Sequence, residues 1–77
     1  MDSLLPRVCA IVAATFNIPV ASVTAASSPE TIEAWDSMGH LTLLLTLEQE
    51  LDVQIPPEDG EQMKDVAAIV KLISPLL

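Results

Sequence analysis

Hydrophobic residues recur at helical spacing near the start of the chain. Within residues 4–16 an apolar side chain appears every four positions, at Leu4, Val8, Val12 and Phe16. This spacing is typical of one face of an α-helix. Ser3 is a suitable N-cap, Asn17 suits the left-handed position after a helix, and Pro19 prevents the helix from continuing. The pattern therefore predicts a first helix over residues 4–16.

A second helix is predicted from Ser37 or Met38 to Leu51, because leucines again follow a helical repeat. Asp36 and Ser37 are both favourable capping residues at its start. The leucines form two stripes: Leu41, Leu44, Leu45 and Leu51 on one side, and Leu43 and Leu47 on another. A helix that is apolar on more than one face is either central in a bundle or keeps an apolar strip for a partner.

The C-terminal part predicts one short helical turn and a last helix. Pro56 and Pro57 stop any helix before them, and residues 58–63 begin with acids, which favour a helix start. Asp65 is the expected cap of the last helix, and Pro75 marks its end. Between them, apolar residues are spaced at three and four positions: Val66, Ile69, Val70 and Ile73.

Residues 18–36 are predicted to form a long loop, because they are rich in Ser, Thr, Ala and Pro. Its isolated apolar residues, Val20, Val23 and Ile32, are expected to pin it onto the helices. A loop of this length is uncommon in a small domain unless it is functional. We expect one domain over residues 1–77. The predicted fold class is all-α, a small bundle of three main helices and one short helix, with the long loop between the first two helices.

The charge balance narrows the choice of partners. Eleven acidic residues outnumber three basic ones, and the formal net charge is −8. Such a chain repels nucleic acid and anionic lipid and favours basic protein partners. In addition, no segment reaches the roughly 18 apolar residues that a membrane-spanning helix needs. We therefore expect neither nucleic-acid binding nor a membrane span.

Cys9 is the only cysteine, so the chain cannot form an internal disulfide or a cysteine-rich metal site. It lies within the first helical pattern, where a small buried hydrophobic residue is expected. The N-terminal segment is apolar enough to suggest a signal peptide, but Arg7 interrupts it, and its removal would take away much of the core. These features predict a cytoplasmic protein without a metal ion.

Residues 33–41, EAWDSMGHL, carry the candidate chemistry. Ser37 and His40 are three positions apart and could share one face of a helix, as a nucleophile and its base would. The chain has no other histidine and no G-x-S-x-G motif, and it offers little room for a pocket. An enzyme is therefore not expected. Ser37 could instead be only a helix cap, or the acceptor of a phosphate group, which a helix N-terminus favours.

The longer segment WDSMGHLTLLLTLEQELDVQIP, residues 35–56, resembles the attachment segment of acyl carrier proteins. In that family an Asp-Ser-Leu motif starts the second helix of a four-helix bundle, and this chain has Asp36-Ser37-Met38. The helix order, the long first loop and the acidic charge agree over essentially the full chain. The resemblance implies a phosphopantetheine arm, taken from coenzyme A, on Ser37, and recognition of Asp36 by a phosphopantetheinyl transferase. The arm would hold acyl or aminoacyl intermediates as thioesters.

The resemblance also implies partners, namely the transferase, a ligase that loads an acyl or aminoacyl group, and a downstream acyltransferase or synthase. The second helix would face them through Met38, Leu41 and Leu45, while Glu48 and Glu61 would supply charge. Core packing is the alternative for these apolar residues, and a solvated face is the alternative for the glutamates. A monomer is expected. If the serine is only a cap, the chain is instead an acidic helical module for protein interaction.

Three positions depart from the carriers of primary fatty-acid synthesis. Gly39 and Thr42 stand where those carriers usually have acids, and Trp35 directly precedes Asp36. We therefore expect a discrete carrier for secondary metabolism, surface polysaccharide or aminoacyl transfer, with a housekeeping fatty-acid carrier as the alternative. Acids at positions 39 and 42 would then restore housekeeping character. Trp35 either anchors the loop or shields the base of the arm, and His40 is either a solvated or half-packed helix residue or in contact with a partner or the arm.

Overall fold

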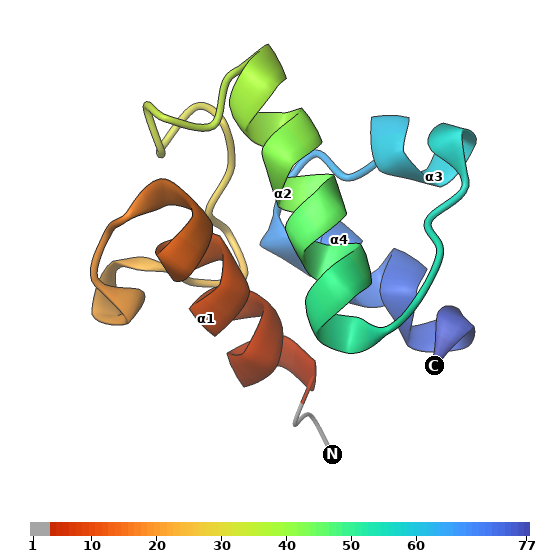
Figure 1. Ribbon diagram of the computed structural model, residues 1–77. Coiled ribbons are helices and arrows are strands. Elements are labelled where there is room, and N and C mark those ends of the chain that lie inside the picture. The colour runs from red at the N-terminus through yellow and green to blue at the C-terminus, as the bar shows by residue number, and fades with distance from the viewer. Residues whose placement is uncertain (1–3) are drawn as a thin grey trace.

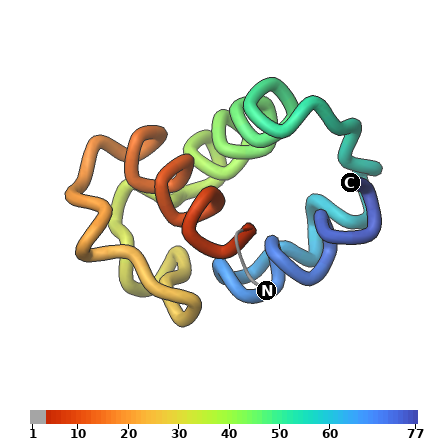
Figure 2. The backbone as a smooth tube through the Cα atoms, turned by 90° about the horizontal axis from the view of Figure 1, so that it is seen from below, coloured from red at the N-terminus to blue at the C-terminus, as the bar shows by residue number. Residues whose placement is uncertain are grey.

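The computed structural model describes residues 4–77, which form helices joined by loops and turns (Figure 1). The elements in chain order are α1 (Leu4–Phe16), η1 (Val20–Ser22), α2 (Ser37–Leu51), α3 (Pro57–Glu61), α4 (Val66–Ile73) and η2 (Ser74–Leu76), where η1 and η2 are single 3₁₀ turns. Within this range there is no β-strand, and the predicted all-α bundle of three main helices and one short helix is confirmed. α1 contacts both α2 and α4 and lies at one side of the pair in Figure 2.

The helix ends follow the capping residues in the sequence. Asn17 has a left-handed backbone (φ 56°), and the next N–H, that of Ile18, donates to the carbonyl of Ala13 at 3.0 Å, as in a Schellman motif. The Asp36 and Asp65 carboxylates cap α2 and α4, accepting from backbone N–H groups at 2.8 and 2.7 Å. The predicted ends of α1, α2 and α4 are therefore confirmed, whereas the predicted cap Ser3 lies outside the described residues.

The core is aliphatic, and α2 supplies its centre. Leu43, Leu47 and Leu51 are buried at every fourth position, so the prediction that Leu51 belongs to the other stripe was wrong. The reason is geometric, since positions four apart lie on one face of a helix. The fully buried large side chains are Trp35, Leu43, Leu47, Met63, Ile69, Ile73, Val8, Val12 and Val66.

The long loop is held against α4 by its own backbone. The first two N–H groups of α4, those of Val66 and Ala67, donate to the carbonyls of Ser27 and Ala25, each at 3.0 Å. This satisfies two donors that a helix start otherwise leaves open. Val23 and Ile32 are buried, as predicted. Val20 is 54% exposed, and its predicted pinning role was wrong, because the 3₁₀ turn that follows Pro19 directs this side chain outward.

Cys9 lies on the inner face of α1 and is buried, as expected for a small hydrophobic side chain. Burial disfavours the thiolate and raises the pKa of this thiol. Cys9 is therefore a packing residue with a poorly reactive side chain. Among residues 4–77, no helix combines the length and the apolar character that crossing a membrane requires.

Candidate functional site

Ser37 is the first residue of α2 and is exposed. The preceding Asp36 caps the helix, because its Oδ1 accepts the N–H of Gly39 at 2.8 Å. The first intrahelical bond runs from the N–H of His40 to the carbonyl of Asp36 at 2.7 Å. The N–H groups of Ser37 and Met38 thus belong to the open, electropositive end of the helix. A negatively charged group attached to the serine hydroxyl would be stabilised there.

His40 connects three segments through its imidazole ring. The indole N–H of Trp35 donates to Nδ1 at 2.9 Å, and Nε2 lies 2.8 Å from the carbonyl oxygen of Gly60. An indole N–H can only donate and a carbonyl can only accept. The arrangement therefore requires a neutral ring with its proton on Nε2. We call this series of contacts, Trp35 to His40 to Gly60, the His40 bridge.

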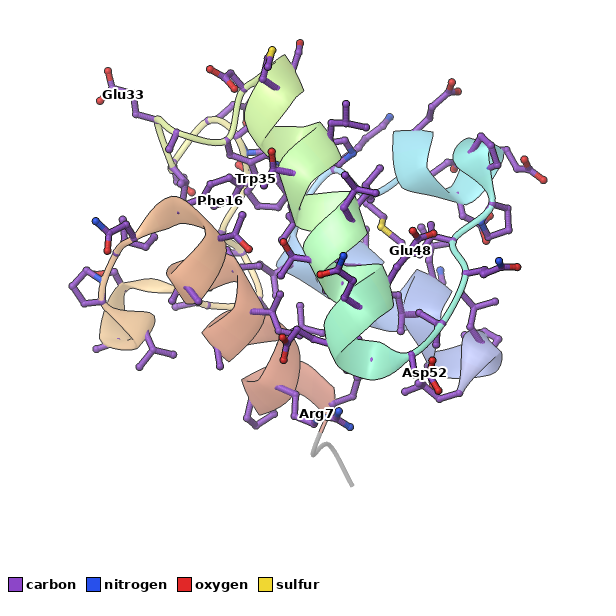
Figure 3. All side chains as sticks on the ribbon, viewed as in Figure 1. Arg7, Phe16, Glu33, Trp35, Glu48 and Asp52 are labelled. Atoms are coloured by element: carbon purple, nitrogen blue, oxygen red, sulfur yellow. The ribbon has the colours of Figure 1, made fainter. Side chains whose placement is uncertain are left out.

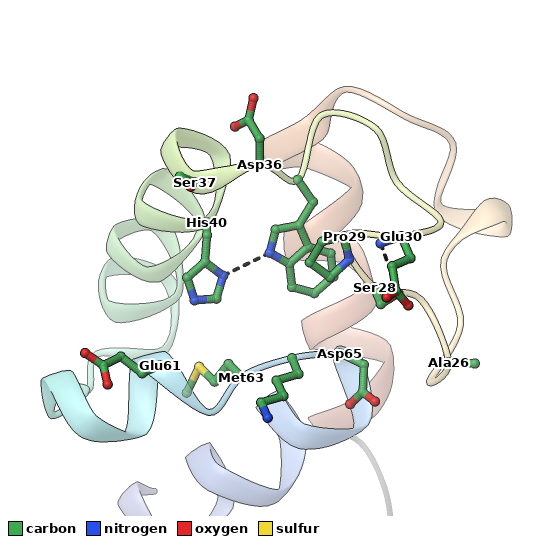
Figure 4. A pocket seen from close by; sticks show the side chains of 12 residues that line it. Ala26, Ser28, Pro29, Glu30, Asp36, Ser37, His40, Glu61, Met63 and Asp65 are labelled. Atoms are coloured by element: carbon green, nitrogen blue, oxygen red, sulfur yellow. Dashed lines mark hydrogen bonds between the residues drawn. The ribbon is translucent and has the colours of Figure 1, made fainter.

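The His40 bridge excludes the Ser37–His40 pair as a nucleophile and its base. A base must offer a free nitrogen to the hydroxyl it deprotonates. In His40 both nitrogens are used, and Figure 4 shows the ring directed toward Trp35. The prediction that His40 is half-packed is confirmed. Its part in a bridge was not foreseen, and the only hint in the sequence was an indole five positions before an imidazole.

Trp35 anchors the loop to the bundle immediately before the site. The side chain is 1% exposed. Its ring stacks on that of Phe16, with centroids 5.7 Å apart (Figure 3), and on that of His40, with centroids 6.2 Å apart. Stacking of this kind contributes beyond the buried area. Of the two roles predicted for Trp35, the structure therefore supports the anchor. Because Asp36 and Ser37 come directly after it, this anchor also fixes where α2 begins.

Gly39 is explained by packing. A Cβ at this position would lie 2.2 Å from the carbonyl oxygen of Ala34 and 3.0 Å from Cε1 of Phe16. The backbone of the segment before α2 thus passes directly over Gly39, and no side chain fits without moving it. The expectation that acids at positions 39 and 42 would restore housekeeping character stays a prediction, and the overlap at position 39 argues against it. Thr42, in contrast, is exposed, and its Oγ1 hydroxyl donates to the carbonyl oxygen of Met38 at 3.1 Å.

An open groove of about 970 Å³ lies beside Ser37. It separates the start of α2 from the loop and from the segment between α3 and α4 (Figure 4). The side chains that line it are mostly polar or charged: Ala26, Ser28, Pro29, Glu30, Trp35, Asp36, Ser37, His40, Glu61, Met63, Lys64 and Asp65. The groove is large enough to take a flexible polar chain that starts at the serine.

The side chains predicted to face partners differ in exposure. Met38, Leu41 and Leu45 are 76%, 59% and 54% exposed, and their spacing of three and four places them along one strip of α2. Glu61 is exposed at the end of α3. Glu48 is half-buried, and its Oε2 accepts the N–H of Ile55 at 2.8 Å (Figure 3). That carboxylate therefore holds the connection between α2 and α3, a role that the sequence did not suggest.

The relatives found by comparison with known proteins agree with one another, because those described below are all acyl carrier proteins. No family model matches the chain. The chain is 36% identical over 74 residues to the acyl carrier protein of Thermosynechococcus vestitus, covering 95% of this chain and 90% of the relative. The acyl carrier protein of Prochlorococcus marinus is 29% identical, with 94% and 90% covered. The solution structure of a holo acyl carrier protein from Geobacter metallireducens superposes with a TM-score of 0.86 over 97% of this chain and 86% of that one. At 23% identity, this last match establishes the fold alone.

Proposed function

Because this chain belongs to the acyl carrier protein family, we propose that Ser37 is the attachment site of its phosphopantetheine arm. Members of the family carry a covalent arm of this kind and are carriers rather than enzymes. The observation that carries the proposal is the placement of an exposed serine at the first position of α2, directly after its capping Asp36. Residues 1–77 would act as one carrier domain.

The residues around Ser37 fit a phosphate-linked arm. The hydroxyl is exposed, the open helix end favours a negative group, and the groove begins beside it. The arm supplies a terminal thiol that holds an acyl or aminoacyl group as a thioester. The chain contributes a fixed tether, which raises the local concentration of the carried group at each partner. Asp36 is exposed beside the serine and would be the residue that the transferase contacts.

Loading of the purified chain tests this proposal. Incubation with coenzyme A and a broad-specificity phosphopantetheinyl transferase is expected to add one phosphopantetheinyl group, seen in the intact mass. Ser37→Ala should abolish the gain, because it removes the attachment oxygen. Ser22→Ala, at another exposed serine, should load normally. If transferases from several sources all leave the mass unchanged, the proposal fails, and the chain is better described as an acidic interaction module.

We further propose that this carrier serves a specialised pathway. The first turn of α2 contains no acid, and Gly39 is fixed by packing, so this surface differs from the acidic start expected of a fatty-acid carrier. The partners would be the transferase, a loading ligase, and an acyltransferase or synthase. The loaded chain should be a poor substrate for enzymes of fatty-acid synthesis. Turnover equal to that of their own carrier would contradict this part of the proposal.

The exposed strip of α2 gives a test of partner docking. Leu45→Glu is expected to lower kcat/KM for transfer to a partner enzyme by about tenfold, the effect of losing one well-buried interface contact. Helical content should not change, because Leu45 is 54% exposed. Leu47→Glu is the contrasting variant, since Leu47 is 0% exposed and the charge should unfold the chain. Unchanged transfer by Leu45→Glu would place the docking surface elsewhere.

A further inference from the structure

α3 is joined to α2 at one point beside the proposed attachment site. The point of contact is Gly60, which is buried. A Cβ there would be 2.9 Å from Cδ1 of Leu44, so the Leu44 side chain of α2 packs directly against the Gly60 backbone of α3. At the same point the Gly60 carbonyl accepts Nε2–H of His40 at 2.8 Å. The boundary between α2 and α3 is therefore closed both by packing and by a hydrogen bond.

The His40 bridge continues this closed surface from Gly60 to Trp35, along the wall of the groove. Trp35, on the other side of His40, is 1% exposed, as is Met63 from the segment between α3 and α4. Beneath them Leu43 and Leu47 are fully buried. Among residues 4–77, every buried side-chain nitrogen or oxygen has a hydrogen-bond partner. A group that starts at Ser37 thus meets a closed surface between itself and the aliphatic core.

A carried alkyl chain would gain free energy by leaving water for this core. To reach it between α2 and α3, the chain would have to separate His40 from Gly60 and leave the Nε2–H group and a buried carbonyl without partners. In the groove, which is open to solvent, an alkyl chain would instead keep part of its surface in water and gain less than by full burial.

We propose that His40 is a specificity-determining residue, because the His40 bridge keeps the carried group in the groove and out of the core. The carrier would then suit short or polar acyl groups, including aminoacyl groups, which lose little by remaining in contact with water. Long alkyl groups would stay exposed and be disfavoured. This inference rests on the proposed attachment at Ser37 and names the class of cargo for that same site.

The test compares carriers loaded with a short and a long acyl group. The transferase would load the chain from acetyl-coenzyme A or decanoyl-coenzyme A, and intact mass would confirm each product. In the unsubstituted chain the two products should have the same Tm and the same emission from Trp35, the only tryptophan. In His40→Ala, the decanoyl product should melt at least about 4 °C above the acetyl product, with a shifted emission, because the chain can enter the core.

The melting temperatures test the inference about cargo, whereas the intact mass tests the proposed attachment at Ser37. Gln62→Ala, an exposed change at the end of α3, should behave like the unsubstituted chain. A decanoyl-dependent rise in Tm without any substitution would overturn the inference, and so would its absence in His40→Ala. If His40→Ala does not fold, His40→Asn, whose shorter amide cannot span both partners, gives the same comparison. An unchanged mass would overturn the proposed attachment, and the inference with it.

Discussion

Trp35→Ala is expected to lower the free energy of unfolding by about 3–5 kcal/mol, the usual cost of truncating a buried tryptophan. The indole is 1% exposed and stacks on Phe16 and His40. Its loss opens a cavity and removes the donor to His40 Nδ1. Because a small domain has a total stability of about 5–15 kcal/mol, this variant should be close to unfolded. Denaturant unfolding followed by far-UV circular dichroism measures the change.

Two further variants separate packing from hydrogen bonding. Trp35→Phe retains a ring against Phe16 but has no N–H, so a smaller loss is expected, of which the hydrogen bond accounts for about 0.5–1.5 kcal/mol. Leu45→Ala, at an exposed position, should change the stability by no more than about 0.5 kcal/mol. If Trp35→Ala is as stable as Leu45→Ala, the indole does not anchor the loop.

The anchor matters for the proposed function because Asp36 and Ser37, the proposed attachment residues, come directly after it in the chain. Trp35 holds the backbone at one point, and Asp36 then starts α2 by capping Gly39. Ser37 comes next, so its position is fixed by its neighbours, while its own side chain makes none of the side-chain hydrogen bonds among residues 4–77. A carrier needs this combination, a rigid attachment point with an accessible hydroxyl.

The helix ends could be predicted because local chemistry determines them. Asp36 and Asp65 each accept a backbone N–H three positions later, and Asn17 takes the left-handed conformation. These interactions involve residues that are neighbours in the sequence, so the sequence displays them directly. The proposed attachment motif was visible for the same reason, since Asp36 and Ser37 are adjacent.

Contacts between distant segments could not be predicted in this way. His40 and Gly60 are 20 positions apart, and nothing in either residue type indicates that an imidazole will meet that particular carbonyl. Likewise, the close passage of Ala34 over Gly39 depends on the path of the whole loop. A glycine in a helix can reflect backbone conformation, weak selection or crowding, and only the structure distinguishes them.

Gly39→Ala is expected to destabilise the chain by about 1–3 kcal/mol, the cost of overpacking a tight site. Helix propensity alone predicts the opposite sign, because alanine is better than glycine in a helix interior by about 1 kcal/mol. The glycine does not have a positive φ, so no backbone requirement explains it. The added methyl group would lie 2.2 Å from the Ala34 carbonyl oxygen, and only a shift of that backbone could relieve the overlap. Denaturant unfolding measures the change. If both proteins have the same m-value, the shift of the unfolding midpoint gives the sign of the change in stability.

Gly60→Ala is the matched control, since these are the only two glycines in the chain and both lie in helices. Its new methyl group would meet Cδ1 of Leu44 at 2.9 Å, the far end of a flexible side chain that can rotate away. A change of no more than about 1 kcal/mol is therefore expected, below the loss at Gly39. If Gly39→Ala proves stabilising instead, the segment before α2 moves easily. Position 39 would then be open to the acid found in fatty-acid carriers, and packing would no longer explain its absence.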